Sequence, residues 1–301
     1  MMKMKRRSSL LLLLLLNVAF LALVADAQVP KEEPKSALLY RISGKGLKKP
    51  SYLFGTIHLI CQKDMFPAET IKSLIAQTGQ VILEIDLDDP EVLQKAAKGS
   101  VMVDGKSLKD QLKPEEFAKL DELFKAYLGI PFAPFQSLRP ALISTILLRS
   151  PKVMGCPGPA AYDSFLVENA AANNLPIIGL ENVEAEFAAL DSQPLAKQIE
   201  SLNKFAATPE KNFGDFKNMY QIYLKQDSDA LYKFATKDSD ADGLSPEKLL
   251  VERNLAWIPV IEKNISAAPS FIGVGGGHLG GEKGVVELLR KQGYILTPIR
   301  L

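Results

Sequence analysis

The histidines are the residues of this sequence whose number and placement most clearly suggest chemistry. The chain of 301 residues contains two, His58 and His278, and each ends a Gly-x-x-His tetrad at the exit of a predicted strand. Glycines there let the backbone turn sharply and approach a ligand closely, and α/β sheets place their sites at the carboxyl ends of strands. One such histidine would be an ordinary polar residue, but two in matching positions favour a shared site.

Two imidazoles do not complete a catalytic metal site, so a carboxylate is sought as the third ligand. Glu84 is the first candidate, because it lies within the apolar run Val81–Leu87, which predicts a buried strand where an unpaired carboxylate is costly. A structural carboxylate in an ion pair is the alternative. Glu181 is the second candidate, at the end of a strand-like run, although a helix beginning near Val183 would also favour a negative charge there.

Arg253 interrupts an apolar stripe on a helix predicted to begin at Ser245 and to reach about Asn264. The other residues on that face are Leu249, Ala256, Trp257 and Val260. A guanidinium in this position either extends to solvent or points at a buried anion, and we favour the buried anion. The flanking Glu252 and Asn254 are predicted to be surface residues.

Composition excludes several classes of protein. Lys and Arg total 36 against 35 Asp and Glu, so the chain lacks the basic excess typical of nucleic-acid-binding proteins. Two cysteines are too few for a four-Cys zinc site or a disulfide-dense scaffold. The glycine-rich segment 273–281 has no G-K-[ST] element, so a phosphate-binding P-loop is not indicated. The sequence contains no G-x-S-x-G, which argues against the nucleophile elbow of a serine hydrolase.

The first 27 residues predict a secretory signal. A basic start is followed by the apolar segment Leu10–Val24 and by Ala25-Asp26-Ala27, which predicts cleavage before Gln28. The apolar segment is shorter than the ~20 residues that a membrane-spanning helix needs, so cleavage is favoured over an uncleaved anchor. We therefore expect an exported protein, periplasmic or extracellular, with no stable membrane anchor after cleavage.

The two cysteines, Cys61 and Cys156, can pair in such an oxidising compartment. An even count slightly favours a bridge over two separate buried thiols.

The order of predicted elements indicates an α/β fold. Each end of the chain reads as strand, Gly-x-x-His, loop, helix and strand, which predicts two β-α-β-type units that contribute to one mixed sheet. A mainly helical insert at about 90–264 separates the two units. After the signal at 1–27 and a polar leader at 28–36, residues 37–301 are predicted to form a single domain.

Several of these motifs together resemble the TraB/GumN family, also called the Tiki-like superfamily, over about residues 38–298. The motifs are Gly55-Thr-Ile-His58, the strand around Glu84, Gly179-Leu-Glu181, Glu252-Arg-Asn254 and Gly275-Gly-Gly-His278-Leu-Gly280. The resemblance implies a fold related to the erythromycin-esterase and ChaN-like proteins. It also implies metal-dependent protease activity, as described for the animal Tiki members that act on Wnt proteins. Their substrates are not carried over to this chain.

The resulting hypothesis is an exported metallohydrolase, a peptidase acting on a peptide or protein. His58 and His278 would ligate a divalent metal, with Glu84 as third ligand or general base; Arg253 would stabilise the oxyanion, and Glu181 is a further catalytic candidate. Zinc, manganese and cobalt all suit such ligands. Two alternatives remain open: a non-catalytic protein that binds a peptide or an anion, and a partner in envelope polysaccharide assembly that docks through the helical insert.

Overall fold

The computed structural model describes residues 36–237 and 245–301, so the predicted signal at 1–27 lies outside the described residues, as does the predicted leader except for Ser36. Six strands form one sheet in the order β4-β3-β5-β2-β1-β6. The strands are β1 (Leu39–Gly44), β2 (Ser51–Thr56), β3 (Gln80–Leu83), β4 (Ile177–Gly179), β5 (Ser270–Gly275) and β6 (Tyr294–Ile299). Strand β1 is antiparallel to both of its neighbours, and the other pairs are parallel. The predicted α/β fold with a mixed sheet is therefore confirmed.

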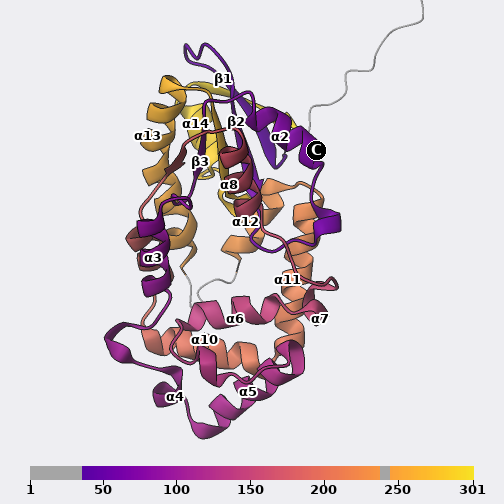
Figure 1. The fold of residues 1–301 in the computed structure, drawn as a ribbon, viewed down its shortest axis with the longest axis vertical. Helices are drawn as coiled ribbons and strands as arrows, with labels where there is room; N and C mark the ends of the chain where they lie inside the picture. Colours follow the sequence, from indigo (N-terminus) through magenta and orange to yellow (C-terminus); the bar gives the residue numbers. More distant parts are fainter. Residues whose placement is uncertain (1–35, 238–244) are drawn as a thin grey trace, which may run out of the picture. The chain divides into compact units, whose positions relative to one another are not determined.

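The central strands are buried along their length because helices pack against the sheet. Every residue of β2 and β3 is buried, as are the first five residues of β5. Such continuous apolar runs are typical of parallel strands covered on both faces. In Figure 1, α2 (Ala68–Ile75) and α8 (Tyr162–Ala172) lie on one side of these strands, and α13 (Glu252–Ala267) lies on the other.

The topology brings the ends of three central strands to one edge of the sheet. Strands β2 and β3 both pair in parallel with β5, which lies between them. Their carboxyl ends therefore point the same way, and Thr56 at the end of β2 is in register with Gly275 at the end of β5. The two tetrads and the segment after β3 must then meet at this edge, which is where open α/β sheets form their sites.

Strand β3 is shorter than the sequence predicts. The apolar run Val81–Leu87 indicates one strand, but β3 ends at Leu83, and Glu84 is the first residue beyond it. An acidic turn follows, in which Asp89 caps α3 (Pro90–Gly99) by accepting a hydrogen bond from the backbone of Glu91. The backbone bends at Glu84 and Ile85, before this turn, and the Glu84 side chain lies at the sheet edge.

The predicted insert is helical in the described residues except for β4. Its helices include α3, α8 and α13, given above, and the first residues of α13 follow a single π-helical turn, Glu247–Val251. The remaining ones are α4 (Leu108–Gln111), α5 (Pro114–Leu128), α6 (Pro140–Leu148), α7 (Pro151–Met154), α9 (Val183–Leu190), α10 (Leu195–Ala207), α11 (Pro209–Leu224) and α12 (Ser228–Thr236). No helix of the described residues is both long and apolar enough to cross a membrane.

Two hydrophobic cores stabilise the described residues. The larger surrounds the sheet and includes Phe54, Phe271 and Trp257. The smaller lies among helices of the insert, where buried residues of α5, α6 and α10, Phe124 among them, pack with Phe132 from the segment between α5 and α6. Helix α11 contributes Phe213 to the smaller core and two tyrosines, Tyr220 and Tyr223, to the larger. It therefore connects the insert with the region that carries the tetrads.

Candidate active site

The two Gly-x-x-His tetrads lie against each other because their glycines lack side chains. A Cβ atom on Gly55 would lie 2.7 Å from a methyl of Leu279 and 3.0 Å from the Cα of Gly276. Any larger residue would separate the two segments. The backbones that precede His58 and His278 are thus in direct contact, as expected for neighbouring parallel strands.

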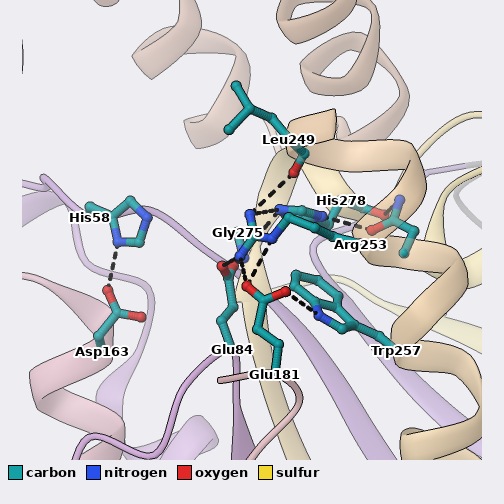
Figure 2. Close-up of polar contacts among 10 residues, drawn as sticks. His58, Glu84, Asp163, Glu181, Leu249, Arg253, Trp257, Gly275 and His278 are labelled. Atoms are coloured by element: carbon teal, nitrogen blue, oxygen red, sulfur yellow. Dashed lines mark hydrogen bonds and ion pairs between the residues drawn. The ribbon is translucent and has the colours of Figure 1, made fainter. Parts of the chain in front are cut away.

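Arg253 forms the centre of the polar cluster shown in Figure 2. Its Nε and Nη2 donate to Glu181 Oε1 at 2.9 and 2.6 Å, and Nη2 also donates to Glu84 Oε2 at 2.7 Å. The guanidinium is 11% exposed and is thus a buried cation between two carboxylates. Burial lowers its pKa, but the charges and hydrogen bonds of Glu84 and Glu181 outweigh that effect and leave the pKa raised.

Glu84 is held as an anion by the groups around it. Its Oε1 accepts a hydrogen bond from the backbone N–H of Gly275 at 2.7 Å, while Oε2 accepts from Arg253. Burial raises the pKa of Glu84, yet positive charge at His278, Arg253 and His58 and the Gly275 hydrogen bond together lower it to about 2. Because His278 is neutral near pH 7, Arg253 is the main partner there.

Glu181 lies inside the cluster rather than at the surface of a helix end. Its Oε1 accepts from Arg253, and its Oε2 accepts from Trp257 Nε1 at 3.1 Å. The side chain is 9% exposed. Helix α9 is capped by Asn182, whose side chain accepts from the Ala185 backbone, so the charge of Glu181 is directed to Arg253 instead.

His278 is buried and contacted on several sides. Its Nδ1 is 2.7 Å from Asn254 Oδ1, its Nε2 is 3.4 Å from Arg253 Nη1, and its ring lies 4.5 Å from that of Trp257. Glu84 Oε1 is 4.0 Å from Nε2. Burial, supported by the charge of Arg253, lowers the pKa of His278 to about 4 despite the nearby Glu84. The ring is therefore neutral at physiological pH.

Asn254 is one of the most deeply buried polar residues of the site, and the expectation of a surface position was wrong. Its side chain has no exposed area and contacts His278 and two backbone carbonyls. Helical periodicity does not predict the burial of Asn254, because the chain segment 278–284 covers the face of α13 that carries this residue. Glu252, by contrast, is exposed, as predicted.

His58 has a different environment. Its side chain is 71% exposed, and Nδ1 is 2.8 Å from Asp163 Oδ2 at the start of α8. The hydrogen bond to this carboxylate, with additional charge from Asp163 and Glu84, raises the pKa of His58 to about 9 against the effect of desolvation. Figure 2 shows His58 and Asp163 to one side of Glu84 and His278 to the other.

The loop after His58 is anchored although its histidine is exposed. Cys61 and Cys156 form a disulfide, which confirms the pairing favoured from the sequence. Ile60 pairs with Ala160 in an isolated β-bridge, and Tyr220 Oη accepts from the Cys61 backbone at 2.9 Å. These contacts fix the loop to the segment that leads into α8 and therefore to Asp163.

The TraB/PrgY/gumN family model matches residues 38–298. The chain belongs to this family. Among curated proteins it is similar to Metalloprotease TIKI1 of Danio rerio (21% identity) and of Homo sapiens (22%), and to Metalloprotease TIKI2 of Danio rerio (21%). Each match covers 81% of this chain and 60, 59 and 57% of the respective relative. The chain thus spans about three-fifths of the length of these relatives, and no solved structure is a significant match.

In this TraB/PrgY/gumN-family chain, the structure brings together Glu84, Glu181, Arg253 and His278. His58 is electrostatically coupled to Glu84 but hydrogen-bonds Asp163. Within residues 36–237 and 245–301, no three His, Cys, Asp or Glu side chains are grouped so that they could hold a metal ion. The three ligands predicted from the sequence do not form a ready-made metal site in this arrangement.

The chemistry of the donors nevertheless fits a metal. In both histidines Nδ1 is paired with an oxygen, of Asp163 or of Asn254, which is how metal-ligating histidines are usually oriented, with Nε2 toward the metal. Beside His58, the Thr56 hydroxyl is buried and has no hydrogen-bond partner among the described residues. The Thr56 hydroxyl is therefore free to form a hydrogen bond with a further group at the site.

Sequence reasoning missed three residues of this site. Asp163 and Asn254 are the Nδ1 partners of the two histidines. Glu186 on α9 is the third; burial and the charge of Glu84 raise its pKa, which indicates a carboxylate close to the cluster. Asn254 belongs to one of the family motifs, but helical periodicity predicts a surface position for it. Asp163 and Glu186 are ordinary polar residues on predicted helices, and their partners lie far along the chain.

Proposed function

We propose that this TraB/PrgY/gumN-family protein is a metal-dependent hydrolase that cleaves peptide bonds. The observation that carries the proposal is the meeting of a neutral imidazole, an ionised carboxylate and a buried guanidinium at the carboxyl edge of the sheet. Perturbed titratable groups that converge in this way are typical of active sites. The relatives named metalloproteases support the same class of reaction.

The residues that would hold the metal are His58 and His278, through Nε2, and Glu84, through its carboxylate. A divalent ion bound to such ligands would lower the pKa of a bound water and polarise the scissile carbonyl. Zinc, manganese and cobalt remain the candidates. His58 must lose its proton to become a ligand, so metal binding is expected to release protons.

Arg253 would stabilise the negative charge that develops on the carbonyl oxygen during attack. Its guanidinium is already oriented, because Glu181 accepts from both Nε and Nη2. A fixed positive charge of this kind stabilises developing negative charge electrostatically, and it acts strongly away from bulk water. Glu181 and Trp257 therefore act as positioning residues that fix the guanidinium.

We place this activity outside the cytoplasm. The basic and apolar start of the sequence supports export. The disulfide between Cys61 and Cys156 supports an oxidising compartment. A peptide or protein is the proposed substrate.

The proposal is tested with purified protein by measuring bound metal by mass spectrometry and hydrolysis of a fluorogenic peptide library before and after chelation. Activity should disappear with the chelator and return with one of the three metals. His58→Ala, His278→Ala and Glu84→Gln should each abolish metal binding. Glu252→Gln, an exposed carboxylate beside Arg253, is the matched control and should retain both properties. Metal-independent hydrolysis, or full metal occupancy in either His variant, would contradict the mechanism.

One observation favours a second candidate, a non-catalytic protein that binds a peptide or an anion at the same cluster. The described residues contain no ready-made group of three metal ligands, whereas Arg253 and the cationic form of His58 offer positive charge. A metal-free protein whose peptide binding is unaffected by chelators would support this candidate. Capture of envelope polysaccharide components through the helical insert would support the assembly role instead.

A further inference from the structure

The orientation of the Asn254 side-chain amide is fixed by the backbone around it. Its Nδ2 lies 2.9 Å from the carbonyl oxygen of Lys283 and 3.3 Å from that of His278. A carbonyl oxygen only accepts hydrogen bonds, so the NH2 group of the amide must face these two atoms. The other end of the amide, Oδ1, is then the atom that lies 2.7 Å from His278 Nδ1. Because Oδ1 only accepts, His278 Nδ1 must carry a proton.

The opposite side of the imidazole leads to the same assignment independently. His278 Nε2 lies 3.4 Å from Arg253 Nη1, and a guanidinium has donors but no acceptor. A proton on Nε2 would place two donors face to face in a site that is almost closed to solvent. A lone pair on Nε2 instead accepts from Arg253. The two neighbouring residues of α13 therefore specify one tautomer from the two sides of the ring.

We infer that Asn254 is a positioning residue that holds His278 in the Nδ1–H tautomer, with the Nε2 lone pair directed to the side of Arg253 and Glu84. Trp257 packs on the ring at a centroid distance of 4.5 Å and limits its rotation. The tautomer of His278 does not depend on what the protein does. Its consequence rests on the proposed function, in which the Nε2 lone pair of His278 would bind the metal.

The Nδ1 partner of His278 is an amide, whereas that of His58 is a carboxylate, and the two have different effects on the charge of the ring. At His58 the Nδ1 partner is Asp163, whose negative charge favours the protonated ring. Asn254 fixes the tautomer of His278 without adding a charge to a cluster that already contains Glu84 and Glu181. A carboxylate in its place would also lose the two N–H donors that face the carbonyls of His278 and Lys283.

The test is a long-range proton–nitrogen correlation spectrum of metal-free protein labelled with ¹⁵N in histidine, recorded near neutral pH. The chain has two histidines, so the spectrum of His58→Gln assigns the remaining ring to His278. The wild-type protein should show a protonated Nδ1 and an unprotonated Nε2 at His278. Asn254→Leu should shift part of the population to the Nε2–H tautomer, because only Arg253 then opposes it, whereas Asn264→Leu, which removes an asparagine elsewhere on α13, should keep the single tautomer.

A proton on Nε2 of His278 in the wild-type protein would overturn the inference, and so would an unchanged tautomer in folded Asn254→Leu. If that variant does not fold, the wild-type spectrum alone decides. Metal and peptide do not enter this measurement, so it can succeed when the proposed function fails. With the proposed function correct, Asn254→Leu should also bind metal about 10–100-fold more weakly, as is typical when a metal-ligating histidine loses the hydrogen-bond partner of its other ring nitrogen.

Discussion

The two Gly-x-x-His segments share a motif and an edge of the sheet, but their histidines lie in opposite environments. The side chain of His278 is 6% exposed and that of His58 is 71% exposed. One is paired with an amide and has a pKa of about 4; the other is paired with a carboxylate and has a pKa of about 9. The motif thus determines where each imidazole lies, whereas residues from distant helices determine its protonation.

The two segments are also held in different ways. The loop after His58 is attached to the insert by the Cys61–Cys156 disulfide and by tyrosine hydroxyls. The His278 segment contacts side chains of α13, namely Arg253, Asn254 and Trp257, and Asp229 of α12 accepts a hydrogen bond from the Gly281 backbone. We therefore expect changes in α8, in α11 and around Cys156 to affect His58 first, and changes in α13 to affect His278 first.

Removal of the disulfide should have the largest effect on stability. Cys61 and Cys156 are separated by 95 positions, and in the chain-entropy model a loop of this length contributes about 4–5 kcal/mol to the free energy of unfolding. The double variant Cys61→Ser, Cys156→Ser should lose an amount of this order in urea unfolding. Its His58 resonances should broaden or shift more than those of His278. A loss below about 1 kcal/mol, or equal changes at both rings, would contradict the difference in anchoring.

Alanine at the first glycine of each tetrad should give unequal effects. At Gly55 a Cβ would lie 2.7 Å from Leu279 and 3.0 Å from a backbone carbon, so overpacking should lower the free energy of unfolding by about 1–3 kcal/mol. At Gly275 the nearest atoms are 3.4 Å and 3.5 Å away, so Gly275→Ala should change it by less than about 0.5 kcal/mol. Thermal or urea unfolding measures both. Equal losses would show that the close approach at Gly55 does not position the tetrads.

The smallest and most specific expected effect is a change in the pKa of one histidine, measured by titration of both rings in metal-free protein. His58 should titrate near pH 9 in nuclear magnetic resonance spectra, and Asp163→Asn should move its pKa down toward 6.5, since the carboxylate is the main cause of the increase. His278 should stay neutral down to about pH 4 in both proteins. An unchanged His58 titration in Asp163→Asn would contradict the role given to that hydrogen bond.

The same pKa values predict opposite contributions to stability. The pKa of His58 is higher in the folded than in the unfolded protein, so its contribution is present below about pH 6.5 and is lost as the pH rises through 9. The pKa of His278 is lower when folded, so its effect destabilises the fold as the pH falls from 6.5 to 4. Unfolding of His58→Gln and of the wild-type protein across this range separates the two contributions.

Much of the sheet could be predicted from the sequence, because its signals are local. Apolar runs bounded by turns identify the strands, and two tetrads at strand exits indicate a common edge. Glu84 was recognised as unusual, but the end of β3 at Leu83 was not predicted. Apolar Ile85 and Leu87 extend the hydrophobic pattern past the strand, although the backbone already bends at Glu84 and Ile85.

The partners of the site residues could not be predicted, because they depend on packing between segments far apart. Asp163 is 105 positions from His58, and its helix shows no feature that distinguishes this carboxylate. Arg253 was identified as out of place on an apolar face, but the sequence did not reveal that Glu181 would bind it more extensively than Glu84 does. Helical periodicity predicts a surface position for Asn254, because it does not show which chain segment covers a face.

The most direct test of the central claim is anomalous diffraction from crystals of the protein soaked separately with zinc, manganese and cobalt. The proposed function predicts one anomalous peak bound by Nε2 of His58, Nε2 of His278 and the carboxylate of Glu84, and its absence in crystals of His278→Ala. Ligand distances of about 2.0–2.2 Å would identify direct coordination. A metal bound elsewhere, or no peak at these residues with any of the three ions, would contradict a metal-dependent hydrolase centred on the paired tetrads.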